Sequence, residues 1–518
     1  MLKRFSYQII LVAVFLFVYS WCFDVKLDLN GDNATYISLA RNINDGLGYS
    51  TINPDGVKPT STYPPGYPAL LSVFMFLGID SLIFFKIVNG LLLFGSMLLL
   101  FSAMRRATGD AAATFSALVL CCFCTPMLQF SYIVMSEMLF LFLSAVSIFS
   151  LYKQSQMSDK QFYKSIWFWL AVVSAVAAYH VRTMALALLF AVVVFYAFRK
   201  EWRQTIASAA SIVALMLPWM IRNSAMGLES RYFGMIMKIN PWRPEAGTVQ
   251  TFGDLVEKML KNFDETVLRA FPDLLFPWLK VDYDAPVSGM IILGGLIVLA
   301  IVCYGAWKSG SLRWTLLAYL AANIGLFMLW HGGNGNRYVA PLAPIIYICF
   351  WTGVTAVLTQ LLKVRIKKLQ WLYLLLILPC FVPLQAQHNL SNSPVPQGYR
   401  NYFTAAQDIN AQMPKGTVVA CRKPEMFNYY APNTITIYYK FTQNPLELIG
   451  DLLNKRCDLV VFDMLGYSST GLYLYPAIKA YPSVFKPIAH YKQPDTYIFM
   501  FNRDEAAKIL KDNAESAE

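Results

Sequence analysis

The chain has 518 residues, of which 57% are hydrophobic, 15% are aromatic and only 14% are charged. In a soluble protein, about a quarter of the residues are usually charged and cover the surface, so the composition excludes an ordinary cytosolic enzyme. The aromatic content excludes a disordered chain. The formal net charge of +12 is compatible with nucleic-acid binding, but the places where this charge occurs argue against it.

Eleven apolar runs approach or reach the roughly 20 residues that a membrane-spanning helix needs. They lie at residues 6–23, 82–104, 111–128, 137–152, 166–180, 183–198, 205–221, 287–307, 314–330, 338–362 and 371–386. A cleaved signal peptide is the alternative for the first run. That run is long for a signal peptide, and no small-residue cleavage site follows it, so we interpret it as a retained anchor.

The basic residues predict the orientation of the chain in the membrane. One alternating set of gaps between the runs holds 16 basic and three acidic residues, the other gaps and spans hold 14 and 16, and the tail from 387 holds 13 and 12. Basic residues accumulate on the cytoplasmic side, so the N-terminus is expected inside and the large loops and the tail outside. No outward basic stripe remains, and we expect no nucleic-acid partner.

Three segments on the expected outer side are too long to be simple connections, namely 24–81, 222–286 and 387–518. We therefore predict a polytopic α-helical membrane protein with about 11 spans, made of a transmembrane module at 1–386 and an external α/β domain at 387–518. A transporter usually has short loops and polar groups at mid-membrane, whereas the polar residues of this chain gather outside.

Periodicity predicts elements in two of these external segments. In the tail we expect helices at 400–413 and 445–455, strands at 417–421, 435–439, 458–462 and 496–501, and a frayed charged end over the last dozen residues. Residues 251–271 predict an amphipathic helix on the membrane surface, with Leu255, Met259, Phe263, Val267 and Phe271 on one face.

The first external segment contains Asp24, Asp28 and Asp32 at four-residue spacing, just beyond the first span. Asn30-Gly31 predicts a turn, and Asp32 can cap the helix that follows. The other interpretation is a carboxylate at the membrane surface that takes a proton from an incoming hydroxyl. The run from Tyr63 to Pro68 (YPPGYP) predicts a stiff extended segment that returns to the membrane.

Several motifs together resemble a family. GDNATYISLA and YPPGYPALL in the first loop, then SEMLFLFL, YHVRTMALAL, LPWMIRN and HGGNGNRYVAPLAPII, follow in this order on the expected outer face. The set resembles GT-C fold glycosyltransferases that use polyprenyl-phosphate-linked sugars, and among them the bacterial relatives of protein mannosyltransferases and lipid A aminoarabinose transferases. The resemblance covers roughly residues 1–390, and the tail resembles the family only in position and class.

The resemblance implies transfer of a sugar from a polyprenyl phosphate to an acceptor hydroxyl, with inversion of the anomeric carbon. It implies that Asp32 is the general base and that Glu137 orients the acceptor or binds a metal with Asp32. Cations at the outer ends of spans are then candidates for holding the donor phosphate: Arg337, Arg182, Arg222 and, one turn inside its span, Lys86. The remaining candidates for substrate contact are Tyr36, Tyr63, Tyr67, His331, His180 and Asp28.

Each of these residue types also has a structural interpretation. Glu137 can be an acid favoured at a helix N-terminus, and the arginines can extend to lipid headgroups. The histidines can be hydrogen-bonded structural residues, and the tyrosines can pack rather than stack on a sugar. The sequence requires no cofactor. Dependence on a divalent metal stays open, because members of this broad class differ in it and the first loop contains no D-x-D pair.

The sequence therefore predicts a multi-pass glycosyltransferase of the bacterial inner membrane, with its active site on the periplasmic or extracellular face. Its expected partners are a polyprenyl-phosphate-linked sugar donor, a lipid, glycan or protein acceptor, and the bilayer. Two alternatives remain, namely an outward-facing glycan polymerase or ligase, and a non-enzymatic transporter of lipid-linked glycans. The absence of a G-x-x-x-x-G-K-[ST] loop agrees with a reaction that uses no nucleotide outside the membrane.

Overall fold

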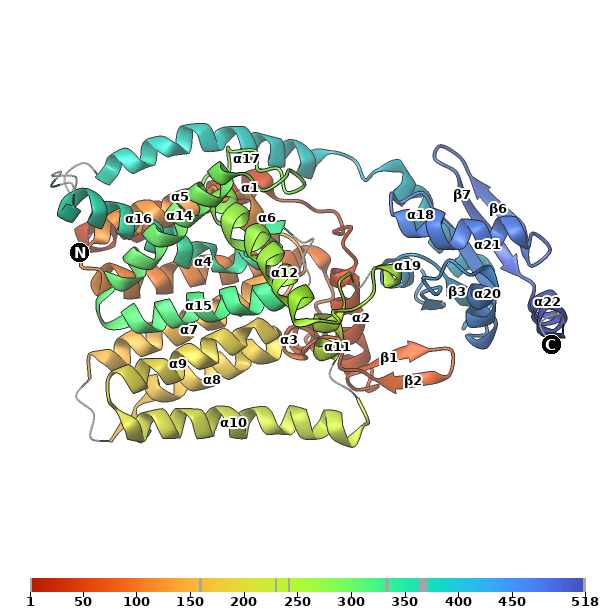
Figure 1. Ribbon diagram of the computed structural model, residues 1–518, viewed down its shortest axis with the longest axis horizontal. Helices are drawn as coiled ribbons and strands as arrows, with labels where there is room; N and C mark the ends of the chain where they lie inside the picture. Colours follow the sequence, from red (N-terminus) through yellow and green to blue (C-terminus); the bar gives the residue numbers. More distant parts are fainter. Residues whose placement is uncertain are drawn as a thin grey trace.

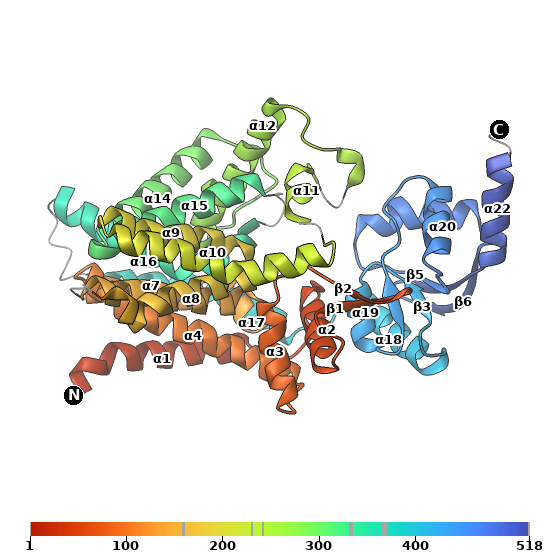
Figure 2. The ribbon, with the colours of Figure 1, turned by 90° about the horizontal axis from the view of Figure 1, so that it is seen from below.

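The computed structural model describes residues 2–157, 161–228, 231–240, 243–330, 335–361, 363 and 370–515. It consists of a bundle of apolar helices with a smaller α/β domain at one end (Figure 1). The N-terminus lies at the opposite end of the bundle from this domain, and α1 (Leu2–Cys22) runs along one side of it (Figure 2).

The helices of the bundle follow the predicted apolar runs closely. After α1 they are α4 (Leu82–Ala107), α5 (Ala111–Cys122), α6 (Thr125–Ser131), α7 (Glu137–Ser155), α8 (Ile166–Val181), α9 (Leu186–Phe198), α10 (Trp202–Ala225), α14 (Gly289–Trp307), α15 (Arg313–Leu329), α16 (Ala343–Ala356) and α17 (Ile377–Asn392). The predicted run 111–128 is divided between α5 and α6, which are bent by 71°.

Within the described residues, seven helices are long and apolar enough to cross a membrane, or eight if the bent pair counts as one span. Shorter apolar helices account for the predicted runs 6–23, 166–180 and 183–198. Each of the eleven predicted runs therefore coincides with an apolar helix or a broken one. The predicted class of a polytopic α-helical membrane protein is confirmed.

Close packing in the bundle depends on small residues. A Cβ atom at Gly305 of α14 would lie 1.7 Å from the carbonyl oxygen of Cys349, and one at Gly353 of α16 would lie 2.1 Å from that of Ile301. Small residues let helix backbones approach in this way in a membrane. A larger side chain at either glycine would separate α14 from α16.

The C-terminal domain contains a mixed five-stranded sheet with the strand order β4-β3-β5-β7-β6. Its strands are β3 (Val418–Ala420), β4 (Ile435–Ile437), β5 (Leu459–Phe462), β6 (Phe485–Tyr491) and β7 (Thr496–Phe501). β3 is parallel to both β4 and β5, while β7 is antiparallel to β5 and to β6. Four of these strands coincide with predicted ones, and β6 was not predicted.

Helices surround this sheet. They are α18 (Gln397–Gln412), α19 (Pro424–Tyr430), α20 (Pro445–Asn454), α21 (Tyr475–Ala480) and α22 (Arg503–Glu515). The predicted helices 400–413 and 445–455 correspond to α18 and α20. The expected frayed end is wrong for residues 507–515, because residues 503–515 form α22, where Ala506 is buried and Leu510 packs against the domain core. Residues 516–518 lie outside the described residues.

The external segments of the bundle carry the remaining elements. They are α2 (Asp32–Asn44), the antiparallel hairpin of β1 (Ser50–Asn53) and β2 (Gly56–Pro59), α3 (Gly66–Phe76), α11 (Arg231–Met237), α12 (Phe252–Phe263) and α13 (Ala270–Leu275). A π-helical stretch, Asp264–Arg269, joins α12 to α13. The expected amphipathic helix is therefore present, with Val267 and Phe271 buried on its inner side.

Two local expectations in the first loop are wrong. The N-cap of α2 is Gly31, whose φ of 98° suits glycine, and Asp32 is the first helical residue, so Asp32 is not the cap. The segment from Tyr63 to Pro68 is not extended throughout, because α3 begins at Gly66. Proline is tolerated in a first helical turn, which explains why Pro68 does not prevent this helix.

Candidate active site

The turn before α2 places Asp32 at the end of the bundle that lies next to the C-terminal domain (Figure 2). The Asn30 backbone N–H donates to Asp28 Oδ1 at 3.0 Å, and the Asn33 side chain donates to the Asp28 carbonyl oxygen at 2.9 Å. Asp28 thus stabilises the turn by accepting hydrogen bonds from Asn30 and Asn33. Its role as a substrate contact stays a prediction.

Asp32 lies between an arginine and a tyrosine. Arg337 Nη2 is 2.5 Å from Asp32 Oδ2, and the Tyr63 hydroxyl donates to Asp32 Oδ1 at 3.0 Å. Both side chains of the ion pair are about a quarter exposed, at 27% for Asp32 and 24% for Arg337. The carboxylate is therefore held firmly but is still accessible from outside.

Glu137 is the second acid of the cluster. It is the first residue of α7, and its side chain is fully buried. Arg182 Nη1 is 2.8 Å from Glu137 Oε1 and Arg337 Nε is 3.7 Å from the same oxygen. The expected Asp32, Glu137, Arg182 and Arg337 are thus brought together from four distant segments, with Arg337 between the two acids.

Ser136 joins the same cluster, although the sequence did not single it out as a site residue. Arg182 donates to Ser136 Oγ at 3.1 Å, and the Tyr36 hydroxyl lies 3.2 Å from the same atom. Nothing in its residue type distinguishes this serine from many others. Its position directly before Glu137 was the available signal.

The three candidate tyrosines pack on one another. The ring centroid of Tyr36 lies 5.0 Å from that of Tyr63 and 5.1 Å from that of Tyr67. Tyr67 is fully buried and hydrogen-bonded to Asn89, and Tyr36 is 4% exposed. Only Tyr63 is partly open to solvent, so it is the best placed of the three to contact a sugar.

The neighbouring acids Asp28 and Asp32 have pKa values shifted in opposite directions. Burial raises the pKa of Asp32, but the charge of Arg337 and hydrogen bonds from Arg337 and Tyr63 outweigh burial, so this pKa lies below its ordinary value. Burial raises the pKa of Asp28. The two neighbouring carboxyl groups therefore lie in different electrostatic environments, and that of Asp32 favours the ionised form.

Lys86 is fully buried in α4 and contacts the first loop. Its ammonium group donates to the backbone carbonyl oxygens of Asp24 at 2.6 Å and Lys26 at 2.5 Å. These bonds explain how a charge is tolerated within an apolar helix. They give Lys86 a structural function, and phosphate binding by Lys86 stays a prediction.

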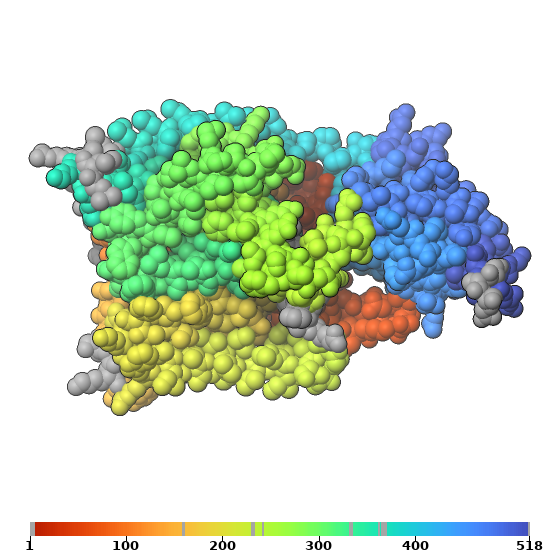
Figure 3. Space-filling view, viewed as in Figure 1, coloured from red at the N-terminus to blue at the C-terminus, as the bar shows by residue number. Residues whose placement is uncertain are grey.

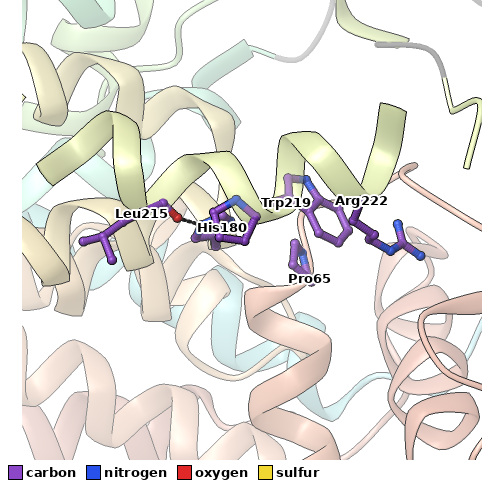
Figure 4. Close-up of a pocket in the computed structure, with 6 residues that line it drawn as sticks. Pro65, His180, Leu215, Trp219 and Arg222 are labelled. Atoms are coloured by element: carbon purple, nitrogen blue, oxygen red, sulfur yellow. Dashed lines mark hydrogen bonds between the residues drawn. The ribbon is translucent and has the colours of Figure 1, made fainter. Parts of the chain in front are cut away.

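Arg222 and His180 lie apart from Asp32, along a hollow of about 340 Å³ lined by Pro65, His180, Leu215, Pro218, Trp219 and Arg222. Figure 4 shows the Trp219 ring between the side chains of His180 and Arg222. Arg222 donates to the carbonyl oxygens of Thr60 and Tyr49, each at 2.9 Å. Its phosphate role stays a prediction, while its observed contacts hold the β1–β2 hairpin to α10.

A metal site does not fit the described residues. Among them, no group of three or more His, Cys, Asp and Glu side chains is arranged so that it could hold a metal ion. Asp32 and Glu137, the two acids proposed as metal partners, are both engaged by Arg337. We therefore derive no step through a metal. His331 lies outside the described residues.

The second external segment holds Arg337 in place. The Gly335 N–H donates to Glu265 Oε1 at 2.8 Å, and the Asn336 side chain donates to Asp273 Oδ2 at 2.6 Å. Glu265 belongs to the π-helical stretch, a feature frequently found near functional sites. The sequence predicted an amphipathic helix in this segment, but its pattern did not distinguish Glu265 and Asp273 as supports for the Arg337 loop.

The fold and the site define a class of protein, namely a polytopic membrane protein with a cluster of carboxylates and arginines at one end of its helical bundle. No protein-family model matches the sequence, and no curated protein is significantly similar to it. Solved structures do match over nearly the whole chain. The match includes both the bundle and the C-terminal domain, which is drawn in blue at one end of the bundle in the space-filling view (Figure 3).

The archaeal oligosaccharyltransferase AglB from Archaeoglobus fulgidus, in complex with an inhibitory peptide and a dolichol-phosphate, has a TM-score of 0.61 and 11% identity over 97% of this chain and 75% of its own. ArnT from Cupriavidus metallidurans bound to undecaprenyl phosphate has a TM-score of 0.59 and 12% identity over 96% of this chain and 98% of its own. The chain therefore has the GT-C fold of these enzymes, and the resemblance is confirmed for the fold.

Proposed function

We propose that the protein is a membrane glycosyltransferase that moves a sugar from a polyprenyl-phosphate donor to an acceptor hydroxyl on the external face. The observation that carries this proposal is the ion-pair cluster in which Arg337 lies between Asp32 and Glu137. Asp32 is partly exposed and lies beside the guanidinium group of Arg337, and a second guanidinium group, that of Arg182, lies on Glu137. This arrangement supplies a base and anion-binding groups at one place.

In the proposed reaction the acceptor oxygen attacks the anomeric carbon, and Asp32 takes the hydroxyl proton. The bond between the anomeric carbon and the phosphate oxygen breaks at the same time, so the carbon is inverted. The leaving polyprenyl phosphate keeps the bond electrons, and Arg337 and Arg182 stabilise its charge. Glu137 holds both arginines in position.

The hollow beside Trp219 supports a lipid-linked donor. Its lining is mostly apolar, it opens between α10 and Pro65, and Arg222 lies at its outer end. Two structural neighbours were determined with polyprenyl phosphates, dolichol-phosphate and undecaprenyl phosphate. We propose such a lipid as the carrier here, while the acceptor is a lipid, a glycan or a protein.

The donor is tested with purified protein in nanodiscs. Labelled sugars carried on undecaprenyl phosphate are supplied together with an extract of the native membranes as acceptor source, and release of undecaprenyl phosphate is measured. We expect consumption of at least one lipid-linked sugar and none of nucleotide sugars. Consumption of a nucleotide sugar without a lipid carrier would contradict the proposal. Movement of intact lipid-linked sugar across proteoliposomes, without release, would favour the transporter.

We further propose that the protein lies in the bacterial inner membrane, with its N-terminus in the cytoplasm and its C-terminal domain in the periplasm or outside the cell. The separation of the N-terminus from that domain by the length of the bundle supports this orientation (Figure 1). A reporter fused after residue 105 is expected to lie in the cytoplasm, and one fused after residue 390 is expected to lie outside it. The reverse pattern would place the cluster on the wrong side.

A further inference from the structure

The C-terminal domain contacts the first external loop next to Asp32. Leu27 and Ala34 of that loop belong to the same buried apolar cluster as Tyr402 and Phe427 of the domain. α19 packs against α2, and the two helices lie side by side in Figure 2. The domain is thus built onto the element that carries the proposed base.

One polar side chain of the domain extends to the turn before Asp32. Lys423 Nζ donates to the backbone carbonyl oxygen of Asn30 at 2.6 Å, and the lysine is only 9% exposed. A Cβ atom at Gly31 would lie 3.6 Å from Lys423 Cδ and 3.7 Å from Nζ. The lysine therefore contacts both residues that directly precede Asp32.

Contacts within the C-terminal domain also fix the position of Lys423. β3 ends at Ala420, and Lys423 is the N-cap residue of α19. The Tyr402 hydroxyl donates to the Lys423 carbonyl oxygen at 3.0 Å and accepts from the Lys423 N–H at 3.2 Å. The ammonium group lies 4.8 Å from the ring centroid of Tyr467, a favourable cation–π arrangement.

We propose that Lys423 is a positioning residue, which fixes the Asn30–Gly31 turn and so the carboxylate of Asp32, and that the C-terminal domain thereby completes the active site. This inference rests on the proposed function. The charge of Lys423 also supports the proposed role of Asp32, because this positive charge contributes to lowering the pKa of Asp32.

Other groups also face Asp32 from the elements packed around it. They are the guanidinium group of Arg337, the hydroxyl groups of Tyr36, Tyr63 and Tyr338, and the carboxyl groups of Asp28 and Glu425. Among these, Arg337 and Tyr63 oppose protonation of Asp32, as Lys423 does. Removal of Lys423 leaves both in place, so the effect on Asp32 is partial and measurable.

The test compares Lys423→Met and Lys423→Arg with the unaltered protein in the nanodisc assay. Lys423→Met is expected to lower kcat about 10- to 100-fold, the size of effect that a small misplacement of a catalytic group produces, while KM for the lipid-linked donor stays within about twofold. The acid side of the pH profile moves to higher pH because Asp32 loses a cation that favours its ionised form. Lys423→Arg restores most of the rate.

Lys486→Met is the matched control, since Lys486 is an exposed lysine on β6 of the same domain. Hydrogen exchange of the 28–35 amides provides a reading that is independent of turnover, and Lys423→Met is expected to accelerate it. If kcat, the pH profile and hydrogen exchange were all unchanged in Lys423→Met, the role of Lys423 would be overturned, but the proposed function would not. Failure of the unaltered protein to consume any lipid-linked sugar would overturn the proposed function, and the inference with it.

Discussion

Replacing Asp32 with asparagine is expected to lower the rate of sugar transfer by about 10²- to 10⁴-fold, the usual contribution of a positioned general base. Asparagine has nearly the same size and still accepts the hydrogen bond from Tyr63, but it cannot take a proton from the acceptor. Arg337 keeps its contact with Glu137 at 3.7 Å, so the fold and the donor-binding groups should be preserved. The rate is measured with the lipid-linked donor identified in the nanodisc assay.

Asp45→Asn is a suitable control, because Asp45 is an exposed acid at the other end of α2. It should have the same expression, thermal stability and rate as the unaltered protein. Binding of undecaprenyl phosphate to Asp32→Asn, measured by native mass spectrometry, should be at least as strong as normal. A rate within threefold of normal would remove Asp32 from the role of base.

The helical bundle could be predicted from the sequence because apolar runs are a direct consequence of the bilayer. A span must bury some 20 residues in hydrocarbon, whichever partners it has. Breaks within a run are harder to foresee. The bend between α5 and α6 lies at Phe123–Cys124, directly before Thr125 and Pro126. A proline suits the first turn of a new helix, but the hydrophobicity of the run alone did not indicate the break.

The members of the site could be predicted, but their contacts could not. Asp32, Glu137, Arg182 and Arg337 each lie at the end of a helix on the same expected side, and the family resemblance connected them. Their pairing depends on how distant helices pack, which no local pattern encodes. For the same reason the sequence did not show that Arg222 donates to the backbone of Thr60 and Tyr49, while its predicted phosphate role stays a prediction.

The contribution of the C-terminal domain was missed for a different reason. Arg422 and Lys423 directly follow the predicted strand 417–421, and the carboxyl ends of parallel strands are where α/β sheets present functional groups. That signal was present in the sequence. What the sequence does not contain is the docking of this sheet edge onto the first loop, which depends on buried contacts such as that of Leu27 with the domain core.

Replacing Arg337 with alanine is expected to affect both donor binding and the base. The loss of a charge-assisted guanidinium contact, worth about 1.5–3 kcal/mol, should weaken binding of undecaprenyl phosphate by about 10- to 100-fold. The same change leaves Asp32 without its main counter-charge. Arg337→Lys keeps the charge but not the planar pair of donors, so it should recover only part of the binding.

The pH profile separates these two effects. A base works only when it is deprotonated, and the charge of Arg337 is the largest of the influences that lower the pKa of Asp32. In Arg337→Ala the acid side of the profile should therefore move to higher pH, although Lys423 and Tyr63 still oppose protonation and Asp28 and Glu425 still face the same carboxylate. Arg337→Lys should show a smaller movement in the same direction.

Arg199→Ala is the appropriate comparison, because Arg199 forms an ion pair of similar exposure with Glu201, at 32% and 27%, far along the chain from Asp32. Its binding and pH profile should both be normal. If Arg337→Ala bound undecaprenyl phosphate normally but had a shifted profile, Arg337 would serve Asp32 and not the phosphate. Arg182, whose guanidinium group lies 2.8 Å from Glu137, would then be the candidate in this cluster that holds the leaving phosphate.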